Sequence, residues 1–133
     1  MSDDAGDEQA HISERRQRGL EKMAEVYGWD VSDGPGDFFG MTVEHLFGEV
    51  WTRDGLSQKE RRILLLGLVI GSGLDDVIGL QLETALRLGE LDPDELRDIV
   101  IFAAHYVGWP KGAKLNTQVE NLIAKAEKPT PAT

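Results

Sequence analysis

The first candidate for chemistry is an amide on an otherwise apolar helical face, at Gln81. Its neighbours on a helical wheel are all hydrophobic, namely Val77, Ile78, Ala85 and Leu88. Because a buried amide without a hydrogen-bond partner is costly, Gln81 needs a partner in the folded protein. The residue either holds a carbonyl or carboxylate oxygen of a bound small molecule, or serves as a core glutamine bonded to a neighbouring helix end. The pattern leaves both interpretations open.

A second candidate is the pair formed by His45 and Glu49, which are one helical turn apart. This spacing lets an imidazole and a carboxylate meet on one helix face. Such a pair can act as acid and base in a reaction. The alternative is an ion pair that faces solvent or another subunit, which is the commoner arrangement.

His105 is a third candidate, on the side of its helix opposite the apolar centre. That centre runs through Leu96, Ile99, Ala103 and Val107. We expect His105 to be exposed in a monomer and able to face a shared site in an oligomer. Its charge changes near neutral pH, which suits acid–base work, although a plain surface histidine fits the pattern as well. Histidines at positions 11, 45 and 105 lack the spacing of a ligand cluster, so we expect no metal site.

Three arginines flank the start of the most apolar helix, at Arg53, Arg61 and Arg62. A planar guanidinium matches a carboxylate, so an anionic ligand would need one of them. We select Arg61 for the ligand and expect the other two to pair with the abundant acidic residues. The aromatic side chains that we expect around a cavity are Trp51, Tyr106 and Trp109. Plain packing at helix ends is the alternative for these rings.

The composition excludes several classes of function. The 133 residues carry a net charge of −10, which disfavours a nucleic-acid partner and adhesion to anionic membranes. The absence of cysteine excludes disulfides and thiol chemistry. The longest apolar run, residues 63–71, is too short to cross a bilayer, and the polar first residues do not resemble a signal peptide. We therefore expect a cytoplasmic protein that does not enter the membrane.

Hydrophobic periodicity predicts helices and no strands, in one domain over residues 12–127 with disordered tails at 1–11 and 128–133. The expected helices cover residues 12–27, 37–50, 58–71, 75–89, 93–107 and 110–126. Asp37 and Ser57 are candidate caps. The strongest start signal is Asp92 followed by Pro93 and Glu95, which together have the pattern of a capping box.

The helix that contains residues 63–70 is apolar nearly all round, which predicts burial on every side. It is either the central helix of a monomeric bundle or a helix that a second subunit covers. We expect an oligomer.

Two segments carry a resemblance to a known family. The first is Gly48-Glu49-Val50-Trp51, followed by a turn and an arginine-bearing apolar helix; the second is the run from Ala104 through Tyr106 to Gly108-Trp109-Pro110. Together they resemble the carboxymuconolactone decarboxylase family, over residues 14–126. The resemblance implies an alkylhydroperoxidase D-like all-α bundle of about six helices, a trimer or hexamer, and a cofactor-free lyase of aromatic compound catabolism.

Several positions depart from the family pattern. The C-x-x-C-x-x-x-H motif of the peroxidase branch falls on Leu74, Val77 and Gln81, so a thiol peroxidase is excluded. The histidine and arginine that decarboxylase members often keep are replaced by Gln81 and Glu83. A further histidine position is Phe102.

Two functions follow from the residues and the resemblance. The first is a lyase that releases carbon dioxide from a small carboxylated lactone or related ring acid. Gln81 and Arg61 would hold oxygens, and His105, or His45 with Glu49, would handle protons. The second is a non-catalytic member of the family that binds small molecules or takes part in an assembly.

Overall fold

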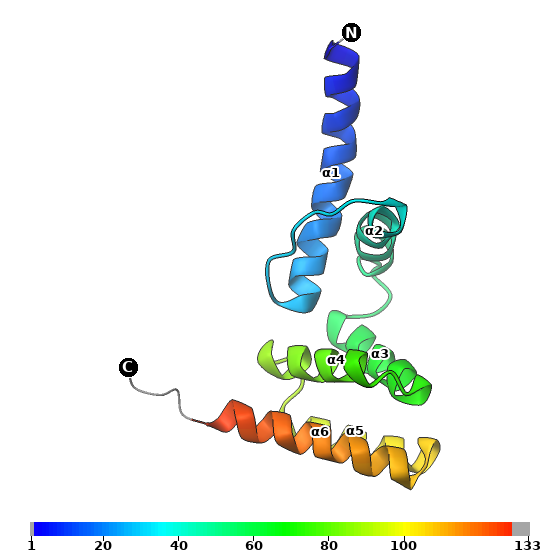
Figure 1. The fold of residues 1–133 in the computed structure, drawn as a ribbon, viewed down its shortest axis with the longest axis vertical. Helices are drawn as coiled ribbons and strands as arrows, with labels where there is room; N and C mark the ends of the chain where they lie inside the picture. Colours follow the sequence, from blue (N-terminus) through cyan, green and yellow to red (C-terminus); the bar gives the residue numbers. More distant parts are fainter. Residues whose placement is uncertain (1, 129–133) are drawn as a thin grey trace. The chain divides into compact units, whose positions relative to one another are not determined.

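A computed structural model describes residues 2–128, with side chains from Glu14 onward, and every element in this range is helical (Figure 1). The elements are α1 (Ser2–Tyr27), α2 (Asp37–Met41), the π-helix η1 (Thr42–Val50), α3 (Gln58–Ser72), α4 (Asp75–Arg87), α5 (Pro93–Val107) and α6 (Trp109–Glu127). The all-α class is confirmed, and α2 with η1 forms the single helix predicted over residues 37–50.

The chain divides into two compact units, an N-terminal unit Met1–Gln58 and a C-terminal unit Lys59–Thr133. The predicted extent of the domain, 12–127, stays a prediction. Helix α1 begins at Ser2 instead of residue 12, so it reaches into the stretch expected as a tail. That stretch contains no proline to stop a helix. Of the predicted C-terminal tail, residues 129–133 lie outside the described range.

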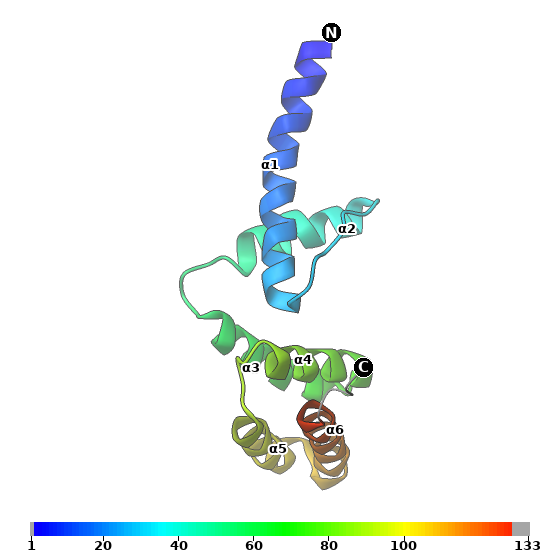
Figure 2. The same cartoon turned by 90° about the vertical axis from the view of Figure 1, so that its left-hand side faces the viewer.

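In the N-terminal unit, α1 packs across the helix formed by α2 and η1 (Figure 2). A glycine makes the contact close: a Cβ built on Gly19 would lie 2.0 Å from the backbone oxygen of Val43. The buried apolar side chains of this unit are Met23, Val26, Val43, Phe47 and Trp51. The small residue on α1 thus sets how closely the two helices approach.

The start of α2 differs from the prediction. Gly36, with φ 94°, occupies the cap position, and no side chain caps the helix. Asp37 is instead the first helical residue, where its negative charge favours the positive end of the helix dipole. The expected cap at Asp37 is therefore wrong, because glycine takes the left-handed backbone conformation required there.

In the C-terminal unit, α3 and α4 form one layer and α5 and α6 form another, as both views show (Figures 1 and 2). A single apolar core joins them, made of Leu66, Val69, Ile70, Ile78, Leu82, Ala85, Leu91, Leu96, Val100, Leu115, Val119 and Ile123. The capping box at the start of α5 is confirmed, because the Asp92 side chain accepts from Glu95 N and the Glu95 side chain accepts from Asp92 N.

Within the described chain, helix α3 is buried on one face, so its burial on every side stays a prediction that depends on a second subunit. Ile63, Leu64 and Leu68 are 41%, 56% and 61% exposed. The buried face of α3 contains Leu66, Val69 and Ile70, which pack into the core. An amphipathic face is enough to hold α3 in this unit, and the remaining apolar side chains stay on the surface.

Candidate active site

Gln81 lies on α4 and is 5% exposed. Its side-chain oxygen accepts a hydrogen bond from Nη1 of Arg62, with 2.5 Å between the two atoms. The prediction that Gln81 sits among apolar side chains and needs a partner is confirmed. The partner is a side chain of α3.

Arg62 has no exposed surface, and its Nε donates to Oε1 of Glu90 at 2.7 Å. Glu90 lies in the turn between α4 and α5, and its side chain is 11% exposed. We call Arg62, Gln81 and Glu90 the buried arginine cluster. A guanidinium removed from water is stable only when it is paired and hydrogen-bonded, and the cluster supplies both.

Local structure explains how these residues meet. Arg62 is on the face of α3 that also carries Leu66, Val69 and Ile70, at helical spacings of four, seven and eight. Gly89, with φ 72°, lets the chain turn after α4, and the backbone N–H of Glu90 donates to Ala85 O at 3.0 Å. The carboxylate is thereby fixed beside the helix that carries Gln81.

The expectation that Arg62 pairs with an acidic residue is confirmed by Glu90, but sequence reasoning selected its neighbour Arg61, which is half-buried on α3, for the ligand. The signal for the burial of Arg62 was present in the sequence. Continuing the apolar stripe of α3 back by four residues from Leu66 reaches Arg62 and not Arg61. A role for Arg61 toward a ligand stays a prediction.

Thr84 adds a second polar group to the buried part of α4. It has no exposed surface, and its Oγ1 is the one fully buried side-chain N or O atom without a hydrogen-bond partner among the described residues. Thr84 follows Gln81 by three residues, so the two side chains are neighbours on the helix. An unpaired hydroxyl next to the buried arginine cluster marks this stretch of α4 as polar and incompletely satisfied.

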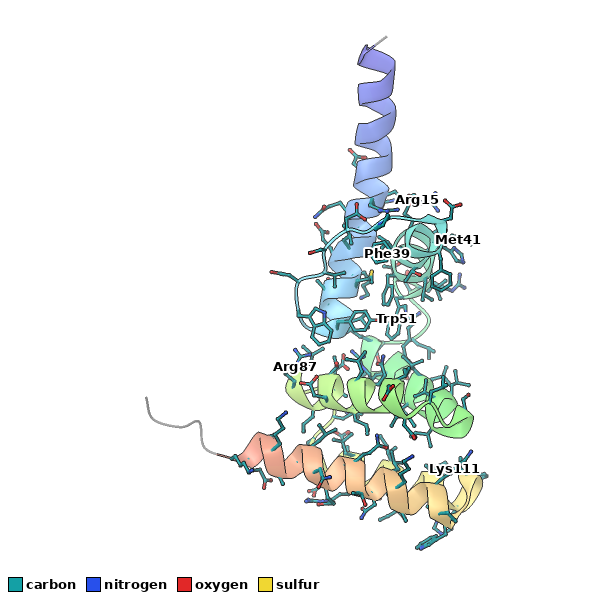
Figure 3. All side chains as sticks on the ribbon, in the orientation of Figure 1. Arg15, Phe39, Met41, Trp51, Arg87 and Lys111 are labelled. Carbon is teal, nitrogen blue, oxygen red and sulfur yellow. The ribbon has the colours of Figure 1, made fainter. Side chains whose placement is uncertain are left out.

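His45 and Glu49 meet as the sequence predicts, with 3.8 Å between Nδ1 and Oε1. Glu49 has a second partner that the sequence did not reveal, because Arg15 of α1 donates to the same oxygen (Figure 3). The hydrogen bond from Arg15 lowers the pKa of Glu49, with a smaller contribution from His45. Both side chains are exposed, that of His45 to 63% and that of Glu49 to 50%.

The three aromatic residues predicted around a cavity have different environments. Trp51 is 9% exposed and stacks on Phe47, with the ring centroids 5.9 Å apart, so it packs within the N-terminal unit (Figure 3). Tyr106 and Trp109 belong to the C-terminal unit and are 80% and 69% exposed. His105 is exposed, as expected for one chain, and its ring meets that of Trp109 edge-on at 6.0 Å.

A groove of about 440 Å³ runs between α3 and α5 in the C-terminal unit. Its walls are mostly apolar and include Ile63, Ile70 and Phe102, whereas Glu95 and Asp98 contribute carboxylates. The Glu95 carboxylate is already paired with Lys59, with 2.6 Å between Nζ and Oε2, so the groove carries less net negative charge than its two carboxylates suggest. The groove is not lined by Arg62, Gln81 or Thr84, so it lies apart from the buried arginine cluster.

Two further features bear on the class of protein. Among the residues with described side chains, no group of at least three His, Cys, Asp or Glu residues is arranged to hold a metal ion. Within residues 2–128, no helix combines the length and apolar character needed to cross a bilayer.

Comparison with known proteins identifies the family. Residues 36–117 match the carboxymuconolactone decarboxylase family. A nitrosuccinic acid decarboxylase of Metarhizium robertsii is 35% identical over 68% of this chain and 66% of its own length. A 4-carboxymuconolactone decarboxylase of Acinetobacter baylyi is 27% identical over 73% of this chain and 78% of its own. No solved structure gives a significant match. The protein, with its helical fold and its two tryptophan-containing segments inside the matched range, belongs to the carboxymuconolactone decarboxylase family.

Proposed function

We propose that the protein is a cofactor-free carboxy-lyase that removes carbon dioxide from a small carboxylated organic acid. The observation that carries this proposal is that two relatives, from a fungus and a bacterium, are both named decarboxylases. The family match over residues 36–117 also spans every residue that the sequence analysis selected for the site. These residues are His45, Glu49, Trp51, Arg61, Gln81, His105, Tyr106 and Trp109.

Two substrate classes fit the proposal. The sequence resemblance favours a carboxylated lactone or related ring acid, as in the name of the Acinetobacter baylyi relative. The higher identity to the nitrosuccinic acid decarboxylase favours an open-chain nitro acid. Both named compounds combine a carboxylate with an electron-withdrawing group, a lactone carbonyl or a nitro group. The open-chain nitro acid is therefore a chemically related alternative to the carboxylated lactone.

The reaction breaks one carbon–carbon bond and consumes one proton. As carbon dioxide leaves, the bonding electron pair passes to the electron-withdrawing group, which becomes an oxyanion. Hydrogen-bond donors that face this oxygen stabilise the transition state more than the ground state. A proton then adds to carbon. In the proposal, Gln81 and Arg61 hold oxygens, and His105, or His45 with Glu49, supplies the proton.

A non-catalytic member of the family is the competing function. The bond from Arg62 to Gln81 supports it in part, because this bond gives the amide oxygen a structural partner inside the protein. The unpaired Thr84 hydroxyl beside Gln81 supports catalysis, because a packed structural core would be expected to satisfy it. Measurement of turnover separates the two functions.

We also propose that the protein works as a homo-oligomer, a trimer or hexamer by resemblance to the family, in the cytoplasm. Large apolar side chains on the surface of the C-terminal unit support an oligomer, since a second copy would remove them from water. The most exposed of these residues are Leu68, Ile101, Phe102, Tyr106 and Trp109. Sedimentation velocity of the protein and of a Leu68→Glu variant checks the proposal, and a wild-type monomer at micromolar concentration would contradict it.

The experiment that tests the function follows carbon dioxide release from carboxyl-labelled 4-carboxymuconolactone and nitrosuccinate by ¹³C NMR. The reaction is run in D₂O, so that protonation at carbon leaves a deuterium in the product. We expect turnover of at least one acid, and a loss of about 100-fold in kcat/KM for Gln81→Ala, as for removal of one oxyanion donor. Absence of turnover for both acids and for related lactone acids would support the non-catalytic alternative.

A further inference from the structure

We infer that Arg62 is a positioning residue that turns the Gln81 amide so that its NH₂ group, and not its oxygen, faces the ligand. This inference rests on the proposed function for the identity of the ligand, an anionic acid.

The orientation of the amide follows from chemistry as well as from distance. The oxygen and nitrogen of a glutamine amide are nearly indistinguishable by shape, so their assignment depends on the hydrogen-bond partners. Arginine has donors only, so the amide atom 2.5 Å from Nη1 of Arg62 must be the oxygen. The NH₂ group therefore points away from Arg62.

The cluster fixes this orientation firmly. Arg62 is fully buried, and its Nε is held by Glu90 at 2.7 Å, so the guanidinium plane cannot turn freely. A planar guanidinium bound at two of its nitrogens loses little further freedom when it holds the amide. A positive group on the amide oxygen also polarises the amide and strengthens its N–H donors.

The NH₂ group is left for a ligand. Among the described residues, Nε2 of Gln81 has no hydrogen-bond partner. Thr84 Oγ1 is the one side-chain N or O atom in this range that is both fully buried and without a partner, so Nε2 is not fully buried. Nε2 therefore keeps some accessible surface although Gln81 is only 5% exposed. A donor with this placement, next to the unpaired Thr84 hydroxyl, suits a carboxylate or an enolate or nitronate oxygen.

The role differs from that of a histidine at this position. An imidazole can exchange protons near neutral pH, whereas an amide cannot. Gln81 thus stabilises negative charge without acting as a base, and the proton must come from another residue. We therefore expect Gln81 to contribute no ionisation to the pH profile of kcat. Replacement of Gln81 should lower kcat without removing a titration from that profile.

The test keeps the Arg62 contact and removes only the donors. In Gln81→Glu a carboxylate still accepts from Arg62 but offers no N–H to the ligand. We expect kcat/KM to fall by about 100-fold or more while the thermal midpoint stays close to that of the wild type. Asn116→Asp, an amide-to-carboxylate change on the exposed surface of α6, is the matched control and should retain wild-type activity. Wild-type activity in Gln81→Glu would overturn the inference.

The role of Arg62 is tested with Arg62→Met and Arg62→Lys in the folded protein. We expect Arg62→Met to lose about tenfold to 100-fold in kcat with a smaller change in KM, and Arg62→Lys to recover part of kcat because lysine still donates to the amide oxygen. Equal activity per folded molecule in the methionine and lysine variants would contradict a positioning role.

A binding measurement keeps this test separate from the proposed function. The side-chain ¹⁵NH₂ signal of Gln81, assigned by its loss in Gln81→Glu, is followed while succinate is added as an unreactive dicarboxylate probe. We expect the signal to shift in wild type and in Arg62→Lys, even if no acid is turned over. A Gln81 signal that does not respond to succinate, in a protein that does decarboxylate an acid, would overturn the inference and leave the proposed function intact.

Discussion

Two arginines organise the two units of this protein, and they do so in different surroundings. In the N-terminal unit, Arg16 donates to Asp33 at 2.8 Å, to Gly34 O at 2.9 Å and to Glu44 at 3.2 Å. Its side chain is 21% exposed, and that of Asp33 is 54% exposed. In the C-terminal unit, Arg62 has no exposed surface, and its partner Glu90 is 11% exposed.

The two environments indicate different roles for the two arginines. Arg16 ties the loop after α1 to the helix formed by α2 and η1, and water can replace much of its bonding. Arg62 has no such replacement, so its partners must be supplied by the protein. One of these partners is an amide rather than a second carboxylate, which suits an amide with a further task. We therefore assign a structural role to Arg16 and a positioning role to Arg62.

The largest expected effect on stability comes from removal of the Arg62 side chain. Arg62→Ala leaves the carboxylate of Glu90 and the amide of Gln81 without their partner in the core, and we expect a loss of about 3–5 kcal/mol in the free energy of unfolding. Urea denaturation followed by circular dichroism measures it. A loss as small as that of Arg16→Ala would show that water reaches the buried arginine cluster.

A close helix contact in the N-terminal unit gives the next effect. Gly19→Ala forces a methyl group toward Val43 O, and we expect a loss of about 1–3 kcal/mol from overpacking. Gly67→Ala in α3 is the matched control, because a methyl group there meets no atom within 4 Å. The control should gain about 0.5–1 kcal/mol from higher helix propensity. Equal effects at both positions would contradict the described packing of α1.

The ion pair of Arg16 with Asp33 predicts that the stability of the protein depends on pH. The hydrogen bond from Arg16 holds the pKa of Asp33 below its ordinary value of 3.8. A depressed folded-state pKa stabilises the protein above the unfolded-state pKa, and the effect is lost as pH falls through the folded-state pKa. We expect Asp33→Asn to lower the midpoint of urea unfolding at pH 6, and the difference from the wild type to shrink as pH falls from 3.8 through the lowered pKa of Asp33. A constant difference between the two proteins over this range would be inconsistent with the pair.

The smallest expected effect is at the surface pair of Arg97 and Glu120 in the C-terminal unit. The two side chains form two hydrogen bonds, at 2.9 and 3.0 Å, but both are more than 40% exposed. Exposed pairs contribute little because water and salt screen them. We expect Glu120→Gln to leave the thermal midpoint nearly unchanged at physiological salt. A clear drop in the thermal midpoint would mean that the exposure of an ion pair does not indicate how much it stabilises the protein, and would weaken the comparison of Arg16 with Arg62.

The sequence predicted the elements better than the partners. Helix periodicity and the capping box gave the helices from residue 37 onward, because these signals are local. The burial of Gln81 was predictable for the same reason. Its partner was not, because Arg62 is separated from it along the chain and a charged residue is rarely fully buried. The bond from Arg15 to Glu49 was missed for a similar reason, since it joins two different helices.

The expected burial of α3 on every side depends on a second subunit, because one chain covers only part of the helix. Periodicity reports which residues are apolar, not how many neighbouring elements are available to cover them. The core of the C-terminal unit covers one face of α3, and the side chains of Leu64 and Leu68 remain exposed. For Trp51, the stacking on Phe47 agrees with the alternative of plain packing, and a place in a cavity wall stays a prediction.

The most direct test of the different roles of the two arginines is kcat/KM for carbon dioxide release by Arg62→Met and Arg16→Met. Both proteins are assayed with the acid that the wild type turns over, at a temperature where circular dichroism shows each to be folded, and rates are expressed per folded molecule. We predict a loss of about tenfold or more for Arg62→Met and wild-type activity for Arg16→Met. Equal activity per folded molecule in the two variants would contradict the positioning role of Arg62.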